Sequence, residues 1–408
     1  MEPRRSVRII QILQEFSLPL VAGVVTAVVW ANLDGHSLHA LVHDPLPGFG
    51  GHLTLHFLSN DIVMAFFFGL AAKEITEACL PGGALNPLRS VVNPAVATLG
   101  GVLAPAGCFF LWVWWSGDTA IANGWAIPTA TDIAVGWLVA RLIFGAAHPA
   151  VQFLVLLAVL DDGIGLAIIA IFYPDPVHPV QPQMLAWVAA GMAGAFGLRR
   201  LGVRNFWPYL VGPGVVSWAG LWMAHLHPAL ALVPIIPFMP SRGRDTGLYV
   251  EEGAHLPHHD TLNRFEFAFK APVDFGLFAF GLANAGVVFS AVGSATAGVL
   301  LGLAAGKTLG VFGFALLARS FGFPLPRGVD LRCLFVLAMT AGVGLTVALF
   351  VAGAAFTDPT LQGAAKMGAL MSVGIAPLAL LAARLLGVRR MAAEPEAEAP
   401  AAAERAAA

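Results

Sequence analysis

Long apolar runs constrain the fold of this chain more than any other feature. About twelve runs approach the roughly 20 residues that an α-helix needs to cross a bilayer, and polar or Pro/Gly-rich breaks separate them. Of the 408 residues 58% are hydrophobic and 11% are charged, against roughly 25% charged in soluble domains. An ordinary water-soluble enzyme is therefore excluded, and an all-α membrane protein is predicted. The runs are 17–33, 55–78, 92–116, 122–141, 150–173, 184–198, 206–223, 229–239, 265–283, 294–318, 332–353 and 362–384. The sixth to eighth runs are short, and the eighth fits a re-entrant segment as well as a span.

The basic residues alternate between the connections in a way that supports this count. Of the 22 Lys and Arg residues, 19 lie in every second connection, and the intervening connections carry none. By the positive-inside rule, this separation predicts an even number of spans with both termini in the cytoplasm. The 19 residues are Arg4, Arg5, Arg8, Lys73, Arg89, Arg141, Arg199, Arg200, Arg204, Arg242, Arg244, Arg264, Arg319, Arg327, Arg332, Arg384, Arg389, Arg390 and Arg405. The basic-free connections lie near 33–54, 116–122, 174–184, 224–229, 283–294 and 353–362.

Two segments differ in composition from the spans. Residues 34–54 form a long outer connection around a Pro-rich turn signal, and a plain loop fits them as well as a hairpin that pairs with a second subunit. Residues 391–408 are rich in Ala, Glu and Pro, which predicts a disordered tail. The remainder, 1–390, is predicted to be one polytopic domain. The cysteines Cys79, Cys108 and Cys333 give no disulfide framework and no metal spacing.

Charged side chains inside the apolar runs are the candidates for function. Asp132, Asp161, Asp162, Asp274 and Lys307 fall near the midpoints of their runs, where each charge costs on the order of 3 kcal/mol. Buried ion pairs that fix helix packing are the structural alternative, but one lysine cannot neutralise this many carboxylates. An excess of carboxylate at the midplane is what a cation or proton site requires. Adjacent carboxylates cannot both ionise easily, so cation and proton occupancy should exclude each other, as antiport requires.

Two of the runs contain helix breaks. In the first, Pro128 removes a backbone donor just before Thr131 and Asp132. In the second, Gly342 and Gly344 interrupt the run at 332–353. Unwound backbone at membrane depth is tolerated only where it is buried in protein or lines a cavity, and paired breaks indicate inverted repeats, here about 92–173 and 294–384. We expect Asp132 to offset the N-terminal ends of the half-helices and Lys307 their C-terminal ends.

Other functional classes fit these features less well. An intramembrane aspartyl protease would need aspartates on separate helices, one of them in a Gly-x-Gly-Asp context, which does not occur here. A sodium-coupled symporter or another cation transporter on the same fold remains an alternative, although a lysine that competes for the ligands of the ion suits exchange better. The sequence has no P-loop, so ATP is not expected as the energy source. No enzymatic activity and no cofactor are predicted.

Four motifs together resemble the NhaA family of bacterial sodium/proton antiporters. They are Thr129-Ala130-Thr131-Asp132-Ile133-Ala134, Asp161-Asp162, Gly306-Lys307-x-Leu309-Gly310 and Ala283-Asn284-Ala285-Gly286-Val287. The resemblance covers roughly residues 15–388. It implies twelve helices with two discontinuous ones crossing at the midplane, and electrogenic exchange of Na⁺ or Li⁺ for more than one H⁺. It also implies a homodimer in the inner membrane, joined partly through 34–54.

The resemblance also implies roles for individual residues. Asp161 and Asp162 look like the pair that binds the cation and protons, with Asp161 as the partner of Lys307. Thr131 and Asp132 look like the lining of the site on the broken fourth helix.

The sequence departs from the family in the region linked with pH activation. The family usually has a glutamate where Ala71 stands here, shortly before Lys73-Glu74. Glu266 matches an acidic position at the start of the ninth helix, but the histidines usual near it are absent. Lys73, Glu74 and Glu266 are therefore only a possible pH-response region. Asp274 has no role in this interpretation. His255, His258 and His259 are interpreted as part of a solvated loop, with a substitute pH sensor as the alternative.

Overall fold

The chain folds as an assembly of helices. The structure, a computed structural model, describes residues 18–46, 53–81, 83, 85, 88–175, 178–241 and 260–391. Within these ranges, all regular secondary structure is helical except for an isolated antiparallel bridge between Pro45 and Thr54. This confirms the all-α prediction. The predicted tail after Met391, the histidines of 255–259 and the centre of the 34–54 connection lie outside the described residues.

Six helices are long and apolar enough to cross a membrane on their own, and a bent pair can supply a seventh span. The bent pair is η2 (Thr119–Thr129) and α6 (Ile133–Phe144), at an angle of 54°. These numbers support a multi-pass protein but do not establish twelve spans. The six are α2 (Leu18–His43), α3–η1–α4 (Leu55–Phe57, Leu58–Val63, Met64–Cys79), α5 (Leu88–Ser116), α7 (Pro149–Phe172), α12–η8–α13 (Ser294–Leu301, Gly302–Lys307, Thr308–Ser320) and α16–η9–α17 (Pro359–Met371, Ser372–Gly374, Ile375–Leu385).

The remaining helices are shorter or less apolar. Two of them, α14 and α15, are the halves of the second interrupted run. The elements are η3 (Pro182–Met184), α8 (Leu185–Arg200), α9 (Trp207–Tyr209), η4 (Leu210–Gly214), α10 (Val215–Met223), η5 (Pro228–Leu230), η6 (Ile236–Phe238), α11 (Thr261–Asn284), η7 (Phe289–Ala291), α14 (Leu331–Thr340) and α15 (Thr346–Ala355).

Two predicted segments look different in the structure. The run at 229–239 forms the short 3₁₀ helices η5 and η6 with a turn between them, not one continuous helix, because prolines at 228, 234 and 237 remove backbone donors. The 34–54 connection is helical in its first part, since α2 continues to His43 across a kink at Asp34. Its second part is paired at the Pro45–Thr54 bridge.

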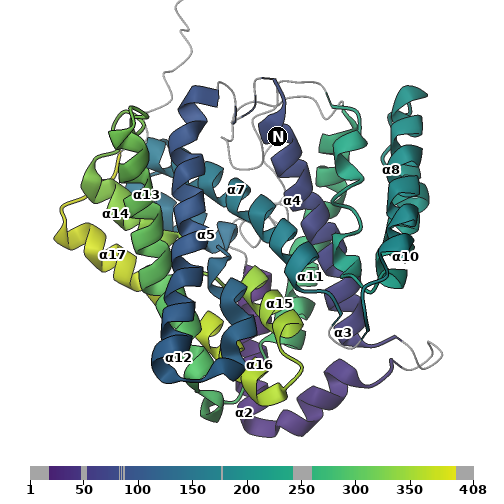
Figure 1. Cartoon of the computed structure of the whole chain (residues 1–408), viewed down its shortest axis with the longest axis horizontal. Coiled ribbons are helices and arrows are strands. Elements are labelled where there is room, and N and C mark those ends of the chain that lie inside the picture. Colours follow the sequence, from purple (N-terminus) through teal and green to yellow (C-terminus); the bar gives the residue numbers. More distant parts are fainter. Residues whose placement is uncertain are drawn as a thin grey trace, which may run out of the picture.

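The two predicted repeats share one order of elements. A long helix, a broken helix and a long helix follow one another as α5, η2/α6 and α7, and again as α12–α13, α14/α15 and α16–α17. The first helices of the two units lie side by side in Figure 1. Their contacts run in opposite directions along the chain, since Gly100 meets Gly310, Pro105 meets Gly306 and Phe109 meets Gly298. This antiparallel packing is what an inverted repeat produces.

Glycines bring α5 and α13 into backbone contact. A Cβ at Gly310 would lie 2.1 Å from the carbonyl oxygen of Gly100 and 2.7 Å from Cβ of Ala104. Gly313, one turn further along α13, would meet nothing within 4 Å.

Gly310→Ala should therefore destabilise the protein. Overpacking of this kind costs about 1–3 kcal/mol, and we expect a lower melting temperature in detergent by nanoscale fluorimetry. Gly313→Ala is the matched control and should be neutral or slightly stabilising, because alanine favours helix by about 1 kcal/mol. Equal melting temperatures for the two variants would contradict the close contact.

Connections of the same kind contact one another. Arg332 Nη1 donates to the carbonyl of Leu386 (3.2 Å), and Thr261 Oγ1 donates to the carbonyl of Arg204 (2.9 Å), so connections predicted to be basic are paired. Connections predicted to lack basic residues are paired too, since Asp175 N donates to the carbonyl of His225 (2.9 Å). We call these two sets of connections the basic end and the non-basic end.

The helices also divide across the molecule. In Figure 1, α8 and α10 lie together at one side, and α14 and α17 lie together at the other. Helix α7 runs between these sides and packs on α4, α5 and α6. It carries Asp161 and Asp162, so the paired carboxylates are placed in the interior.

Candidate ion-binding site

The two helix breaks lie against each other. Asp132 N donates to the carbonyl of Val343 (2.8 Å), and Thr131 Oγ1 donates to the carbonyl of Ala341 (3.1 Å). A Cβ at Gly344 would lie 2.7 Å from the carbonyl oxygen of Ala130. The unwound backbone of each half is thus hydrogen-bonded by the other, which is how irregular backbone is tolerated at membrane depth.

Asp132 caps two helices at once. Its carboxylate accepts hydrogen bonds from Val135 N (3.1 Å), in the first turn of α6, and from Thr346 N (3.1 Å), the first residue of α15. The hydroxyl of Thr346 donates to the same carboxylate. A negative group at two helix N-termini offsets two positive dipole ends together. The structure therefore places Asp132 where the sequence predicted a compensating charge.

The second break depends on glycine and on a serine from α16–α17. A Cβ at Gly342 would lie 2.6 Å from the carbonyl oxygen of Leu303, so only glycine fits there without a shift. Gly344 N donates to Ser372 Oγ (3.1 Å). Ser372 and the capping by Thr346 were missed in the sequence analysis. Their only signal is a hydroxyl within an apolar run, and such hydroxyls are common.

Lys307 joins the two repeats, since it lies in the second and contacts residues of the first. Its Nζ lies 2.7 Å from Asp161 Oδ2 and donates a hydrogen bond to the carbonyl of Thr129, at the C-terminal end of η2. The side chains of Lys307 and Asp161 are 0% and 1% exposed. The lysine therefore neutralises both a carboxylate and a negative helix end, and the contact with Asp161 that the family resemblance implied is present.

Asp162 lies beside this ion pair but outside it. It is partly exposed, and no ion pair among the described residues includes it. Both carboxylates line a cavity with Ala71, Ala130 and Val347, and with Phe68, Gly165, Leu166 and Ile169. Asp161 and Asp162 are the two acidic residues of this lining. Oδ1 of Asp161 is buried without a hydrogen-bond partner. This arrangement offers hard oxygen donors to a small cation.

A second ionic cluster lies between α4 and α11. Lys73 Nζ, 1% exposed, is 2.5 Å from Glu77 Oε2 and 3.5 Å from Glu74 Oε1, and it is also paired with Glu266. The structure thus brings together the three residues of the predicted pH-response region. Glu77 was missed, although its spacing of four residues from Lys73 puts both on one helix face. Asp274 lies on α11 and is not part of the cavity lining.

The chain is similar to known sodium/proton antiporters along most of its length. The family model described as "Na+/H+ antiporter 1" matches residues 8–385. An Na⁺/H⁺ antiporter NhaA of Geotalea uraniireducens is 56% identical over 93% of this chain and 97% of its own length. An NhaA of Geobacter sulfurreducens is 55% identical over 94% and 99%.

A solved structure shares the fold at much lower identity. The sodium/proton antiporter MjNhaP1 of Methanocaldococcus jannaschii has a TM-score of 0.55 and 12% sequence identity, with 92% of each chain covered. Together with the match of the family model over nearly the whole chain, and with relatives more than 50% identical, these comparisons show that the chain belongs to the Na⁺/H⁺ antiporter 1 family.

Proposed function

We propose that this protein is a secondary active antiporter that exports Na⁺ or Li⁺ in exchange for H⁺ by alternating access. The observation that carries the proposal is the buried pair of Asp161 and Lys307 beside the unpaired Asp162, at the crossing of two broken helices. Relatives more than 50% identical are named Na⁺/H⁺ antiporters. Members of the family are transporters, and no enzymatic reaction is proposed.

Competition at the two carboxylates couples the ions. A cation that enters the cavity is bound by oxygens of Asp162 and Asp161, and it must displace protons or draw Asp161 away from Lys307. Cation and proton occupancy are then mutually exclusive, because the same oxygens serve both. Two carboxylates can carry more than one proton for each monovalent cation, which makes the exchange electrogenic.

The same site argues against the alternatives. In a sodium-coupled symporter the cation and its co-transported solute would be bound together, whereas here the Lys307 ammonium competes with the cation for Asp161, which suits exchange better. An aspartyl protease needs two facing carboxylates on different helices to hold a water, but Asp161 and Asp162 are neighbours on α7. No described contact favours either alternative.

We further propose the membrane location, the oligomeric state and the pH-response region of the transporter. It resides in the bacterial inner membrane with both termini in the cytoplasm, a proposal supported by the alternation of basic and basic-free connections and by contacts between basic connections. A homodimer that uses 34–54 is supported by the bridge between Pro45 and Thr54, which can extend by pairing with a second copy. Lys73, Glu74 and Glu266 are proposed as the pH-response region, because a change in the charge of one buried member alters the other pairs.

Transport by the purified protein in proteoliposomes tests this function. We expect Na⁺ and Li⁺ gradients to drive proton movement in the opposite direction, with a membrane potential that changes the rate. The experiment should be repeated with K⁺ and across pH 6–9, because these measurements determine the ion selectivity and the pH dependence of exchange. Proton movement in the same direction as Na⁺ would indicate symport. The absence of any coupled proton movement would contradict transport by this site.

A further inference from the structure

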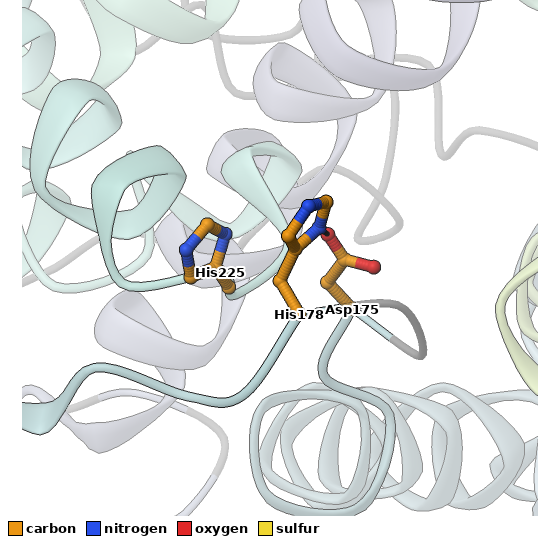
Figure 2. A group of neighbouring side chains, drawn as sticks. All are labelled: Asp175, His178 and His225. Carbon is orange, nitrogen blue, oxygen red and sulfur yellow. Dashed lines mark hydrogen bonds and ion pairs between the residues drawn. The ribbon is translucent and has the colours of Figure 1, made fainter.

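Two histidines and an aspartate meet at the non-basic end of the molecule, away from the cavity of Asp161 and Asp162. Asp175 and His178 follow the end of α7, and His225 follows the end of α10. Figure 2 shows the carboxylate and the two imidazoles gathered at one place. One ligand atom of each residue lies within 4.8 Å of those of the others, and no second group of this kind occurs among the described residues.

The backbone fixes the position of this group. Asp175 N donates to the carbonyl of His225 (2.9 Å), and Gln181 N donates to the carbonyl of Ala224 (3.1 Å), so the two chain segments are hydrogen-bonded together. His225 has φ of 58°, the one positive φ of a non-glycine residue in the described chain. This conformation ends α10 in a Schellman motif, in which His225 N donates to the carbonyl of Trp222 and Leu226 N to that of Leu221. The group is therefore held together before any ligand arrives.

The side chains are also set up as metal donors. His178 Nδ1 lies 2.8 Å from Asp175 Oδ2, so these two donor atoms face each other. A metal ion between them would take the place of the proton that they share. His225 Nε2 lies 3.3 Å from Gln181 Nε2, an amide donor that a metal would replace. The rings of the two histidines are stacked with centroids 4.9 Å apart.

From this geometry we propose that Asp175, His178 and His225 bind a transition-metal dication of the Zn²⁺ type. Two imidazoles and one carboxylate match the preference of Zn²⁺ for nitrogen and oxygen ligands at about 2.0–2.2 Å, with a fourth position for water. The ligand atoms lie within 4.8 Å of one another, and the side chains must turn to bring them to that distance from one ion. The side chains of His178 and Asp175 are 57% and 35% exposed, so the ion reaches them directly from water.

A metal at this place would join two parts of the transporter. Helix α7 carries the ion-binding carboxylates and packs on α4, α5 and α6, whereas α10 packs on α8 at the side of the molecule. The ion would link the ends of α7 and α10. If alternating access moves α7 relative to α8 and α10, an inference that rests on the proposed function, the bound metal slows exchange from the non-basic side.

Metal binding by the purified, tag-free full chain tests the site itself. We expect the wild type to retain one more Zn²⁺ per chain than the double variant His178→Ala/His225→Asn after dialysis, and to bind it at least tenfold more tightly by calorimetry. Asparagine is used at 225 because it tolerates positive φ. His36→Ala, an exposed histidine on α2, is the matched control and should bind like the wild type. Equal Zn²⁺ stoichiometry and affinity in the double variant would overturn the site.

Exchange in proteoliposomes tests the link between the helices. Zn²⁺ on the side of the non-basic end should slow Na⁺/H⁺ exchange severalfold, EDTA should restore it, and the double variant should not respond. If Zn²⁺ binds but exchange is unchanged, the link is wrong while the metal site stands. If the metal-free protein shows no exchange at all, the proposed function fails, and the binding measurement still decides the site.

Discussion

Replacing Asp162 by asparagine will abolish Na⁺-dependent proton movement in everted membrane vesicles. Asp162 is the carboxylate of the cavity that is not paired with Lys307, so it is the negative charge most available to a cation. Asparagine keeps the shape of the side chain but removes the charge and the titratable proton together. The measurement is the fluorescence of a pH-sensitive dye after addition of NaCl, with respiration setting the initial gradient.

Two controls make this result specific. Asp118→Asn changes an aspartate at the N-terminus of η2 that makes no side-chain capping bond, and it should exchange Na⁺ for H⁺ like the wild type. The amount of each variant in the membrane must also match. Proton movement by Asp162→Asn at the wild-type rate would remove this carboxylate from the binding site.

Removing Lys307 will have the largest effect on stability. The lysine and Asp161 are both fully buried, and breaking such a pair by removing one partner costs about 3–5 kcal/mol. Lys307→Ala leaves the Asp161 carboxylate without its counter-charge and the Thr129 carbonyl without its donor. We expect a large drop in melting temperature in detergent and a shifted or weakened pH profile of exchange.

A double variant separates the charge effect from the loss of packing. Asp161→Asn/Lys307→Ala removes both charges, so it should melt at a higher temperature than Lys307→Ala alone. With Asp161→Asn alone as the second single variant, the departure of the double variant from the sum of the two singles gives the coupling free energy of the pair. Equal melting temperatures for all three variants, together with an unchanged pH profile, would exclude Lys307 from the coupling mechanism.

The functional centre could be predicted because charge in a membrane is expensive. Lys307, Asp132 and Asp161 stand out from their apolar runs, and the structure gives each a specific partner. The two breaks could be predicted for a similar reason, since Pro128 and the glycines at 342 and 344 disfavour a continuous α-helix. Rare and costly features therefore locate the candidate site, and its role in transport stays a prediction.

Other features depend on contacts that a linear sequence does not reveal. The run at 229–239 is apolar enough to suggest a span. Its prolines, however, remove the backbone donors that a continuous helix needs, so the run forms two short 3₁₀ helices. The continuation of α2 to His43 was missed because polar residues in 34–43 are typical of a loop. Ser372 and Glu77 matter only through neighbours that the fold brings close.

The double cap at Asp132 has a consequence for motion. Because one carboxylate holds the first turn of α6 and the first turn of α15, neither half-helix can tilt away without exposing donors of the other. The two repeats are therefore mechanically locked at their crossing, and a change of access is easiest when this crossing travels as a single body. We expect the hinges of such a movement to lie outside the crossing, where the surrounding helices can slide along the two repeats.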